Sequence, residues 1–270
     1  MHYFAGLFDA EGWISICPKG NIIVGVQISH RKTLEDFQRA FGGKIHKGSK
    51  KTNKTVYQWD INTINNELFK FVSAIAPYCI IKKERCYLLL DFINKTRAEK
   101  RILRPEYTHK FSILKKPSPC TKEELRFEPT IKPDESFWKW MAGFMDGDGN
   151  FCVYEYQQRT KRVQYTYDSW ISIFNTFSEP IIEVQKRVKG SISSYKGVNF
   201  PIWKWVCNQS SSELVCQRLE PYLIIKKEQC RLMSQYLAIH KTKIRGIDHS
   251  FENICKIQEI IKQIKHHNSL

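Results

Sequence analysis

The stretch FAGLFDAEG at Phe4–Gly12 decides the fold, because it recurs as MAGFMDGDG at Met141–Gly149. A second pair of matching stretches follows at similar spacing, PYCIIKKERC at Pro77–Cys86 and PYLIIKKEQC at Pro221–Cys230. Self-similarity at a nearly fixed spacing is the signature of a duplicated structural unit. The chain of 270 residues is therefore predicted to contain two related halves, each long enough to bury its own core.

Both nine-residue motifs are predicted to form buried helices that pack against each other. Phe4–Phe8 is apolar on every side, and a helix that is apolar all round must be buried all round. Small residues four positions apart leave one face of each helix with little side chain: Gly6 and Ala10, and Gly143 and Gly147. Such faces let two helix backbones approach closely. The glycines that end the motifs, Gly12 and Gly149, are expected as left-handed residues just past each helix.

The last residue of each predicted helix is acidic, Glu11 in the first motif and Asp148 in the second. Two carboxylates on abutting helix ends repel each other and the negative end of each helix dipole. Hard divalent cations would resolve this conflict, because Mg²⁺ prefers carboxylate and water oxygens. The alternative, that both acids cap surface turns, does not explain why an acid follows the small residues in both copies. For Asp9 and Asp146, local hydrogen bonding and catalysis both stay open.

Between the motifs, both halves alternate apolar and polar residues in the manner of half-buried antiparallel strands. The predicted fold class is α+β, and each half reads as helix, hairpin, helix, hairpin, helix. The N-terminal repeat is placed at residues 1–100, a charged and proline-containing linker at 101–135, and the C-terminal repeat at 136–270. The extra residues of the second half are assigned to a longer hairpin loop at Glu155–Asp168, and an apolar pattern after Lys243 predicts an additional C-terminal helix.

The composition indicates that the protein binds an anionic partner. Lys and Arg total 43 against 27 Asp and Glu, and the net charge of +16 implies a polyanion, nucleic acid ahead of an acidic membrane surface. No apolar run approaches the roughly 18 residues that a membrane span needs. The N-terminus lacks the pattern of a secretory signal, and the cysteines form no C-x-x-C pair. We therefore expect free thiols in a reducing intracellular compartment, with a mitochondrion or chloroplast as one option.

The two motifs resemble the paired LAGLIDADG signatures of a single-chain homing endonuclease, and the resemblance spans nearly the whole chain. It implies two pseudo-symmetric αββαββα repeats that form a saddle of antiparallel sheets in one monomer, with the motif helices at the interface. It also implies a site-specific endodeoxyribonuclease that breaks both strands of double-stranded DNA across the minor groove and leaves short 3′ overhangs. The implied cofactor is Mg²⁺, with Mn²⁺ as a substitute and Ca²⁺ supporting binding without cleavage.

The resemblance assigns roles by position. Metal ligation falls on Glu11 and Asp148 with the backbone carbonyls of Ala10 and Gly147 as helpers, the active-site lysine on Lys82 and Lys226, and water orientation on His30 and Asn175. Lysines before a helix are commonly solvated, but their recurrence in both copies favours catalysis. His30 equally fits a plain sheet-edge histidine. Glu11 is one methylene longer than the usual aspartate, so the two metal sites are expected to differ in geometry while remaining active.

The outward side chains of the strands are expected to form a concave basic sheet in the major groove, where a β-ribbon fits. The predicted DNA contacts are Ser15, Cys17, Lys19, Gln27, Arg31, Gln58, Lys83, Asn150, Tyr154, Ser172, Lys204 and Lys227. Because the halves differ at nearly every outward position, the target is expected to be long and asymmetric. Two alternatives use the same fold: an intron maturase, which would bind intron RNA without needing the acids, and a catalytically idle DNA-binding regulator, which would have lost them.

Overall fold

The computed structural model describes residues 1–16, 21–48, 55–62, 66–118, 120–121, 128–160, 163–207, 209–241 and 249–269. The N-terminal half contains, in order, α1 (His2–Glu11), β1 (Gly12–Ile16), β2 (Ile22–Ile28), α2 (Arg31–Phe41), β3 (Lys44–Lys47), β4 (Tyr57–Asn62), α3 (Glu67–Ile75), the 3₁₀ turn η1 (Ala76–Tyr78), α4 (Lys83–Asn94) and α5 (Arg97–Leu114). The C-terminal half contains α6 (Glu135–Asp148), β5 (Gly149–Thr160), β6 (Val163–Asn175), α7 (Glu179–Gln185), β7 (Gly190–Tyr195), β8 (Ile202–Cys207), α8 (Gln209–Leu219), α9 (Lys227–Lys241) and α10 (Phe251–Ser269).

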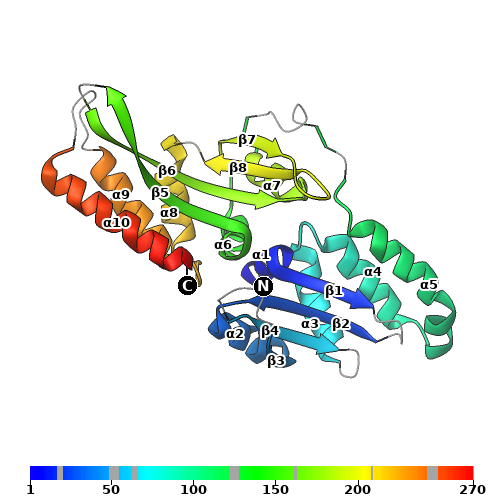
Figure 1. The fold of residues 1–270 in the computed structure, drawn as a ribbon. Coiled ribbons are helices and arrows are strands. Elements are labelled where there is room, and N and C mark those ends of the chain that lie inside the picture. Colours follow the sequence, from blue (N-terminus) through cyan, green and yellow to red (C-terminus); the bar gives the residue numbers. More distant parts are fainter. Residues whose placement is uncertain are drawn as a thin grey trace.

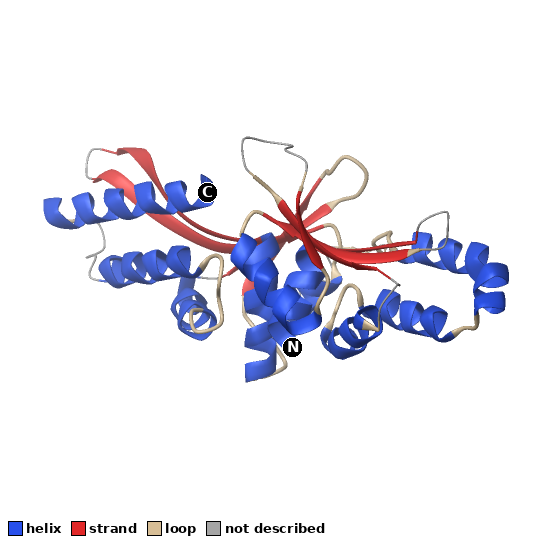
Figure 2. Ribbon diagram, turned by 90° about the horizontal axis from the view of Figure 1, so that it is seen from below, coloured by secondary structure: helices blue, strands red, loops and turns tan. Residues whose placement is uncertain are grey.

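Each half builds a four-stranded antiparallel sheet, with strand orders β1-β2-β4-β3 and β5-β6-β8-β7. The strand registers agree between the halves at three equivalent pairs of positions: Gly12 and Gly149, Val26 and Ile173, and Trp59 and Trp205. The two halves meet at α1 and α6, and most helices lie on one side of the sheets (Figures 1 and 2). The predicted α+β fold of two pseudo-symmetric repeats is confirmed.

Each half has one helix more than the predicted repeat. Helices α3 and α8 lie between the second hairpin and the Pro-Tyr stretch, where the sequence analysis placed no helix. Both bury an apolar face at helical spacing: Leu68, Phe71, Val72 and Ile75 in α3, and Val215, Cys216 and Leu219 in α8. Apolar residues at helical spacing were therefore present in the sequence of both segments. Each repeat has two helices after its second hairpin, where one was predicted.

The 18-residue helix α5 starts just before the predicted linker and covers its first part, although Pro105 lies inside the helix. A capping box begins this helix, in which the Thr96 side chain accepts from the backbone of Glu99 and the Glu99 carboxylate accepts from the backbone of Thr96. Tyr107 packs against Phe92 of α4, with ring centroids 4.8 Å apart. This docking on α4 orders a segment whose proline and charges alone suggested an irregular connection.

The second half is extended at the predicted hairpin, but as strand and not as loop. Strands β5 and β6 have 12 and 13 residues, against 5 and 7 for β1 and β2. Helix α10, the predicted additional C-terminal helix, lies beside the edge strand β5 and packs on α9 (Figure 1). None of the described helices is long and apolar enough to span a bilayer.

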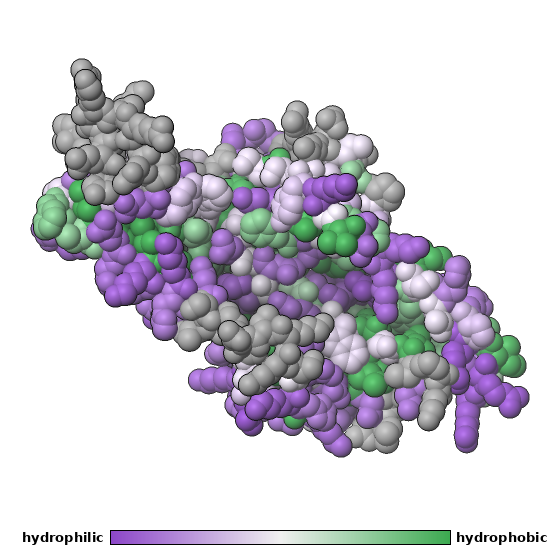
Figure 3. Space-filling view, in the orientation of Figure 1, coloured by the Kyte–Doolittle hydropathy of each residue, from purple (hydrophilic) through white to green (hydrophobic). Residues whose placement is uncertain are grey.

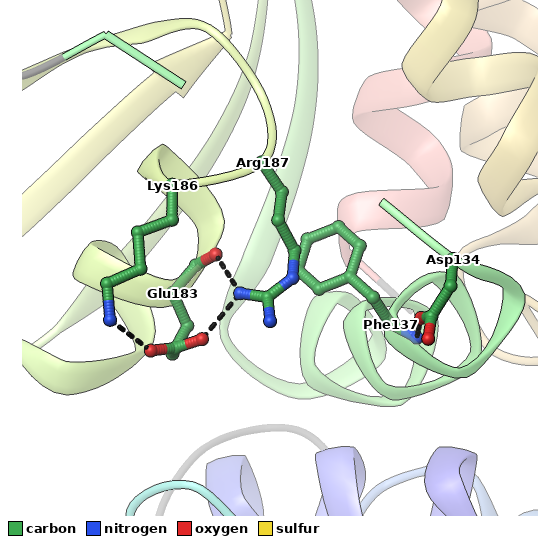
Figure 4. A network of polar contacts seen from close by, with 5 residues as sticks. All are labelled: Asp134, Phe137, Glu183, Lys186 and Arg187. Atoms are coloured by element: carbon green, nitrogen blue, oxygen red, sulfur yellow. Dashed lines mark hydrogen bonds and ion pairs between the residues drawn. The ribbon is translucent and has the colours of Figure 1, made fainter. Parts of the chain in front are cut away.

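A polar network fixes the beginning of α6, the helix that carries the second motif (Figure 4). The Asp134 side chain accepts a hydrogen bond from the backbone N–H of Phe137 at 2.8 Å and so caps the helix. The guanidinium of Arg187 lies 5.1 Å from the centre of the Phe137 ring and is paired with Glu183 of α7. Lys186 pairs with the same carboxylate at 2.7 Å. The beginning of α6 is thus anchored to α7 and to the residues that follow it.

The prediction that Gly12 and Gly149 adopt left-handed conformations is wrong. Their φ angles are −81° and −87° with ψ of 156° and 163°, because each motif helix runs directly into an extended strand. Glycine is needed at both positions because neighbouring atoms leave no room for a side chain. A Cβ atom on Gly12 would lie 2.2 Å from Cδ2 of Phe8, and one on Gly149 would lie 2.5 Å from Sδ of Met145.

Candidate active site and nucleic-acid interface

The motif helices α1 and α6 touch backbone to backbone. A Cβ atom on Gly6 would lie 2.0 Å from the carbonyl oxygen of Trp140, and one on Gly143 would lie 2.0 Å from the carbonyl oxygen of Tyr3. The two contacts are related by the internal symmetry of the chain. Any side chain at either glycine would push the helices apart, so the predicted close approach is confirmed.

A reciprocal pair of hydrogen bonds ties the two helices together. The Tyr3 hydroxyl donates to Oδ2 of Asp146 at 2.7 Å, and Nε1 of Trp140 donates to Oδ2 of Asp9 at 3.1 Å. Asp9 and Asp146 are 1% and 4% exposed. Each buried carboxylate is therefore held by an aromatic donor from the opposite half.

The same two aspartates position the loops that carry the predicted catalytic lysines. Asp9 accepts backbone hydrogen bonds from Ile80 at 2.6 Å and Lys82 at 2.9 Å. Asp146 accepts them from three successive residues, Ile224 at 2.8 Å, Ile225 at 3.0 Å and Lys226 at 2.8 Å. Of the two roles left open for these aspartates, local hydrogen bonding is the one the geometry supports.

Both predicted lysines fold back onto the ends of the motif helices. Nζ of Lys82 donates a hydrogen bond to the backbone carbonyl of Asp9. Nζ of Lys226 donates to three carbonyl oxygens, those of Met145 at 2.8 Å, Gly147 at 2.8 Å and Gly149 at 2.7 Å. Burial lowers the pKa of both ammonium groups, while the neighbouring carboxylates oppose this shift. The two cations neutralise the negative ends of the helices on which the acids stand.

The final acids of the two motifs lie close enough to repel each other. Burial, and secondly the negative charge of Glu11, raise the pKa of Asp148 to about 7. Burial also raises the pKa of Glu11, against the opposing charges of Lys226 and then Lys82. The Glu11 side chain crosses to the other helix, where its Cγ lies 2.9 Å from the position of a Cβ on Gly147. The predicted pairing of the two carboxylates is thereby observed.

This donor set fits a hard divalent cation. Among the described residues, no three or more His, Cys, Asp or Glu side chains gather in one cluster. Two carboxylates with raised pKa values match Mg²⁺, which takes one or two carboxylates and completes its shell with water and substrate phosphates. The Gly147 carbonyl already accepts from Lys226 and retains one lone pair, whereas Ala10 lines the cleft beside Asp148.

The two candidates for water orientation occupy different positions. Nδ2 of Asn175 donates to Oδ2 of Asp148 at 2.7 Å, so Asn175 belongs to the site. His30 instead precedes α2, and its Nδ1 lies 2.7 Å from Oγ1 of Thr33. The strand registers show that Ile28, not His30, is the equivalent of Asn175, which makes the predicted equivalence wrong by two residues.

A cleft of about 500 Å³ opens beside Asp148, between the two halves. Its walls include Lys82 and Ala10 from the first half and Asn175 from the second. Arg85, which the sequence analysis did not select, also lines it. The signal that could have found Arg85 is its place in the repeated stretch, where the second copy has glutamine.

Most of the predicted DNA contacts on strands do lie on the face of the sheets away from the core. The half-buried residues of this set alternate with core residues: Ser15, Gln27, Gln58, Asn150, Tyr154 and Lys204. Nζ of Lys204 lies 4.4 Å from the centre of the Trp170 ring and 5.3 Å from that of Phe174, so aromatic rings hold this cation in place.

The remaining predicted DNA contacts that the structure describes do not lie on the outward face of a strand as exposed side chains. Ser172 points to the same face but is only 1% exposed in the central strand β6, so a direct base contact does not fit its burial. Arg31 is exposed at the start of α2 and pairs with Glu35 at 3.0 Å. Lys83 lines a different cavity, near the beginnings of α1 and α6, while Lys227 is the first residue of α9. Cys17 and Lys19 lie outside the described residues.

The surface around the seam between the halves is polar. Figure 3 shows hydrophilic residues along this seam and over much of the rest of this face, with hydrophobic patches on both halves. The net charge of +16, counted over the whole chain, favours an anionic partner.

Comparison with known proteins identifies the two halves separately. A family model described as LAGLIDADG endonuclease matches residues 141–239, and one described as LAGLIDADG-like domain matches residues 1–75. A search of curated proteins found no match.

Solved structures of meganucleases share the whole fold. The meganuclease I-SmaMI bound to uncleavable DNA is 18% identical with a TM-score of 0.69, over 97% of this chain and 97% of that chain. I-AabMI bound to uncleaved DNA is also 18% identical with a TM-score of 0.69, over 96% of this chain and 97% of that chain. I-CpaMI bound to uncleaved DNA is 17% identical with a TM-score of 0.60, over 97% of each chain. The paired motif helices, the matching sheets and both family models agree, and the chain belongs to the LAGLIDADG family with one family domain in each half.

Proposed function

We propose that this protein is a site-specific DNA endonuclease that uses divalent cations to break both strands of a long, asymmetric target and leaves short 3′ overhangs. The observation that carries the proposal is the pair of Glu11 and Asp148, which stand at touching helix ends with raised pKa values, beside the buried Lys82 and the half-buried Lys226. Two half-buried acids that repel each other at a helix interface destabilise the fold, so their presence favours a function that needs them.

In this proposal the chain's own residues prepare the site. Glu11 and Asp148 would hold Mg²⁺, with the carbonyl of Ala10 nearby, and Mn²⁺ could replace it. When bound, the metal would lower the pKa of the attacking water and neutralise charge on the phosphate. Asn175 fixes the orientation of Asp148 through its hydrogen bond at 2.7 Å. Lys82 and Lys226 supply positive charge close to both carboxylates, where negative charge develops on the phosphate.

The outward strand residues would place the duplex over this site. The halves present different side chains at equivalent positions, which supports an asymmetric target. The I-SmaMI structures lend support by analogy, since one of them was solved with uncleaved DNA in the presence of calcium ions. We therefore expect Ca²⁺ to support binding of this protein to DNA without cleavage.

The test begins with selection of cleaved sites from a randomised DNA library in the presence of Mg²⁺. On a recovered site, Glu11→Gln or Asp148→Asn is expected to abolish double-strand cleavage while Ca²⁺-supported binding persists. Unchanged cutting by either variant would refute the ligand assignment. Binding without any cleavage by the wild type would favour the idle regulator, and stimulation of intron splicing without DNA cleavage would favour the maturase.

A further inference from the structure

Arg85 is a buried cation that the site described so far does not use. It lies in the first turn of α4 and is 7% exposed, and its Nε has no hydrogen-bond partner within the described part of the chain. Its guanidinium lies 5.7 Å from the centre of the Phe177 ring. A buried charge without a hydrogen-bonded partner is costly, so its presence calls for a reason.

The surroundings of Arg85 indicate an anionic ligand. Arg85 and Lys82 both line the cleft that contains Asp148 and Asn175. The positive charge of Arg85 lowers the pKa of Lys82, because the two neighbouring cations repel each other. Two adjacent cations facing a cleft that also contains a candidate metal ligand form a pocket for a phosphate group, which arginine can bind through two parallel hydrogen bonds.

The second half has a neutral residue at the equivalent place. In the repeated stretches IIKKERC and IIKKEQC, Arg85 aligns with Gln229, and each is the third residue of its helix. Gln229 is 5% exposed, and its atom without a hydrogen-bond partner among the described residues is the acceptor Oε1, so only its amide N–H group could meet a phosphate oxygen. Glutamine can donate to a phosphate but carries no charge, and a hydrogen bond from a charged donor is roughly twice as strong.

We propose that Arg85 binds the backbone phosphate at the Asp148 side of the site, and that Gln229 takes this place at the other side. The two DNA strands are then cut by unequal machinery: one phosphate is held by arginine and the other by glutamine. This inference rests on the proposed endonuclease function and adds the residue that distinguishes the strands.

The test uses the full chain and a duplex carrying a site recovered by selection, with a different label on each strand. Arg85→Gln is expected to slow cleavage of one strand by about a hundredfold and to leave the other nearly unchanged. Asn175→Ala, which alters the same cleft, should slow that same strand, while Gln229→Ala should slow the opposite one. Arg85→Lys, which keeps the charge but loses the paired geometry, should recover part of the rate.

A second measurement does not depend on cleavage. In Ca²⁺ buffer, the slope of log Kd against log salt concentration should fall by about 0.9 in Arg85→Gln, the value for one lost phosphate contact, and stay unchanged in Gln229→Ala. Equal slowing of both strands by Arg85→Gln, or an unchanged salt slope, would overturn the inference even if the wild type cuts normally. Thermal denaturation of each variant identifies a purely structural effect, which would lower the midpoint and slow both strands together. Failure of the wild type to cut either strand would instead overturn the proposed function, and this inference with it.

Discussion

Asn175 donates a hydrogen bond to Asp148 at 2.7 Å, and the equivalent position in the other half is the apolar Ile28. The carboxylate of Asp148 is therefore oriented by an amide, whereas Glu11 has a longer side chain and no such partner at the equivalent position. The pseudo-symmetric scaffold thus carries two unequal halves of one site.

The first prediction concerns the pH dependence of cleavage. The hydrogen bond from Asn175 lowers the pKa of Asp148, so Asn175→Ala should raise that pKa further above its present value of about 7. Because a metal ligand must be deprotonated, the acidic limb of the rate profile for one strand should move to higher pH. Strand-specific rates measured between pH 6 and 9 test this. Identical profiles for variant and wild type would show that Asn175 does not control Asp148.

The second prediction concerns stability against pH. The pKa of Asp148 is about 7 in the folded chain against 3.8 for an unperturbed aspartate, so the native state binds more protons between these values. The free energy of unfolding of the metal-free protein should therefore fall as pH rises from about 4 to about 7. Asp148→Asn removes this titration and should be more stable than the wild type at pH 8. Urea denaturation at pH 5 and pH 8 measures the difference, and equal stability of the two proteins at pH 8 would argue against the raised pKa.

The third prediction concerns the helix contact. Gly6→Ala places a Cβ 2.0 Å from a backbone oxygen of the partner helix, and Gly143→Ala does the same in the other direction. Each variant should lose about 1–3 kcal/mol of unfolding free energy, because the helices must separate. Alanine otherwise stabilises a helix by about 1 kcal/mol relative to glycine, so a gain in stability would contradict the close contact. Chemical denaturation of both variants provides the measurement.

The fourth prediction concerns the reciprocal hydrogen bonds. Tyr3→Phe keeps the ring but removes the donor to the buried Asp146, and should cost about 1.5–3 kcal/mol of unfolding free energy. Trp140→Phe removes the bond to Asp9 and should also destabilise, with an added cost from the smaller ring. Tyr78, which is 38% exposed, offers a matched control: Tyr78→Phe should change stability little. Equal effects at positions 3 and 78 would show that the bond to Asp146 is not significant.

The duplicated motif made the centre of the molecule predictable from sequence. Small residues four positions apart predicted two touching helices. An acid directly follows the last small residue in each motif, and this placed Glu11 and Asp148 together. The repeated lysines were likewise found, although their hydrogen bonds to helix-end carbonyls depend on loop geometry that sequence does not express.

Other features depend on strand register and burial, which a single sequence expresses weakly. A slip of two residues at the end of β2 put His30 in the place of Ile28. Ser172 alternates correctly for an outward residue, yet its neighbours in the central strand bury it. A repeat draws attention to the residues that its two copies share, whereas Arg85 stands at a position where the copies differ.

The central claim is that Glu11 and Asp148 jointly hold catalytic divalent cations beneath a bound duplex. The most direct measurement is a crystal structure of the protein on its selected DNA with Mn²⁺, in which anomalous scattering locates the metal. We predict anomalous peaks within about 2.0–2.3 Å of carboxylate oxygens of both residues and next to the phosphates that are cut. Peaks only at other residues, or carboxylates that face away from the DNA, would contradict the account.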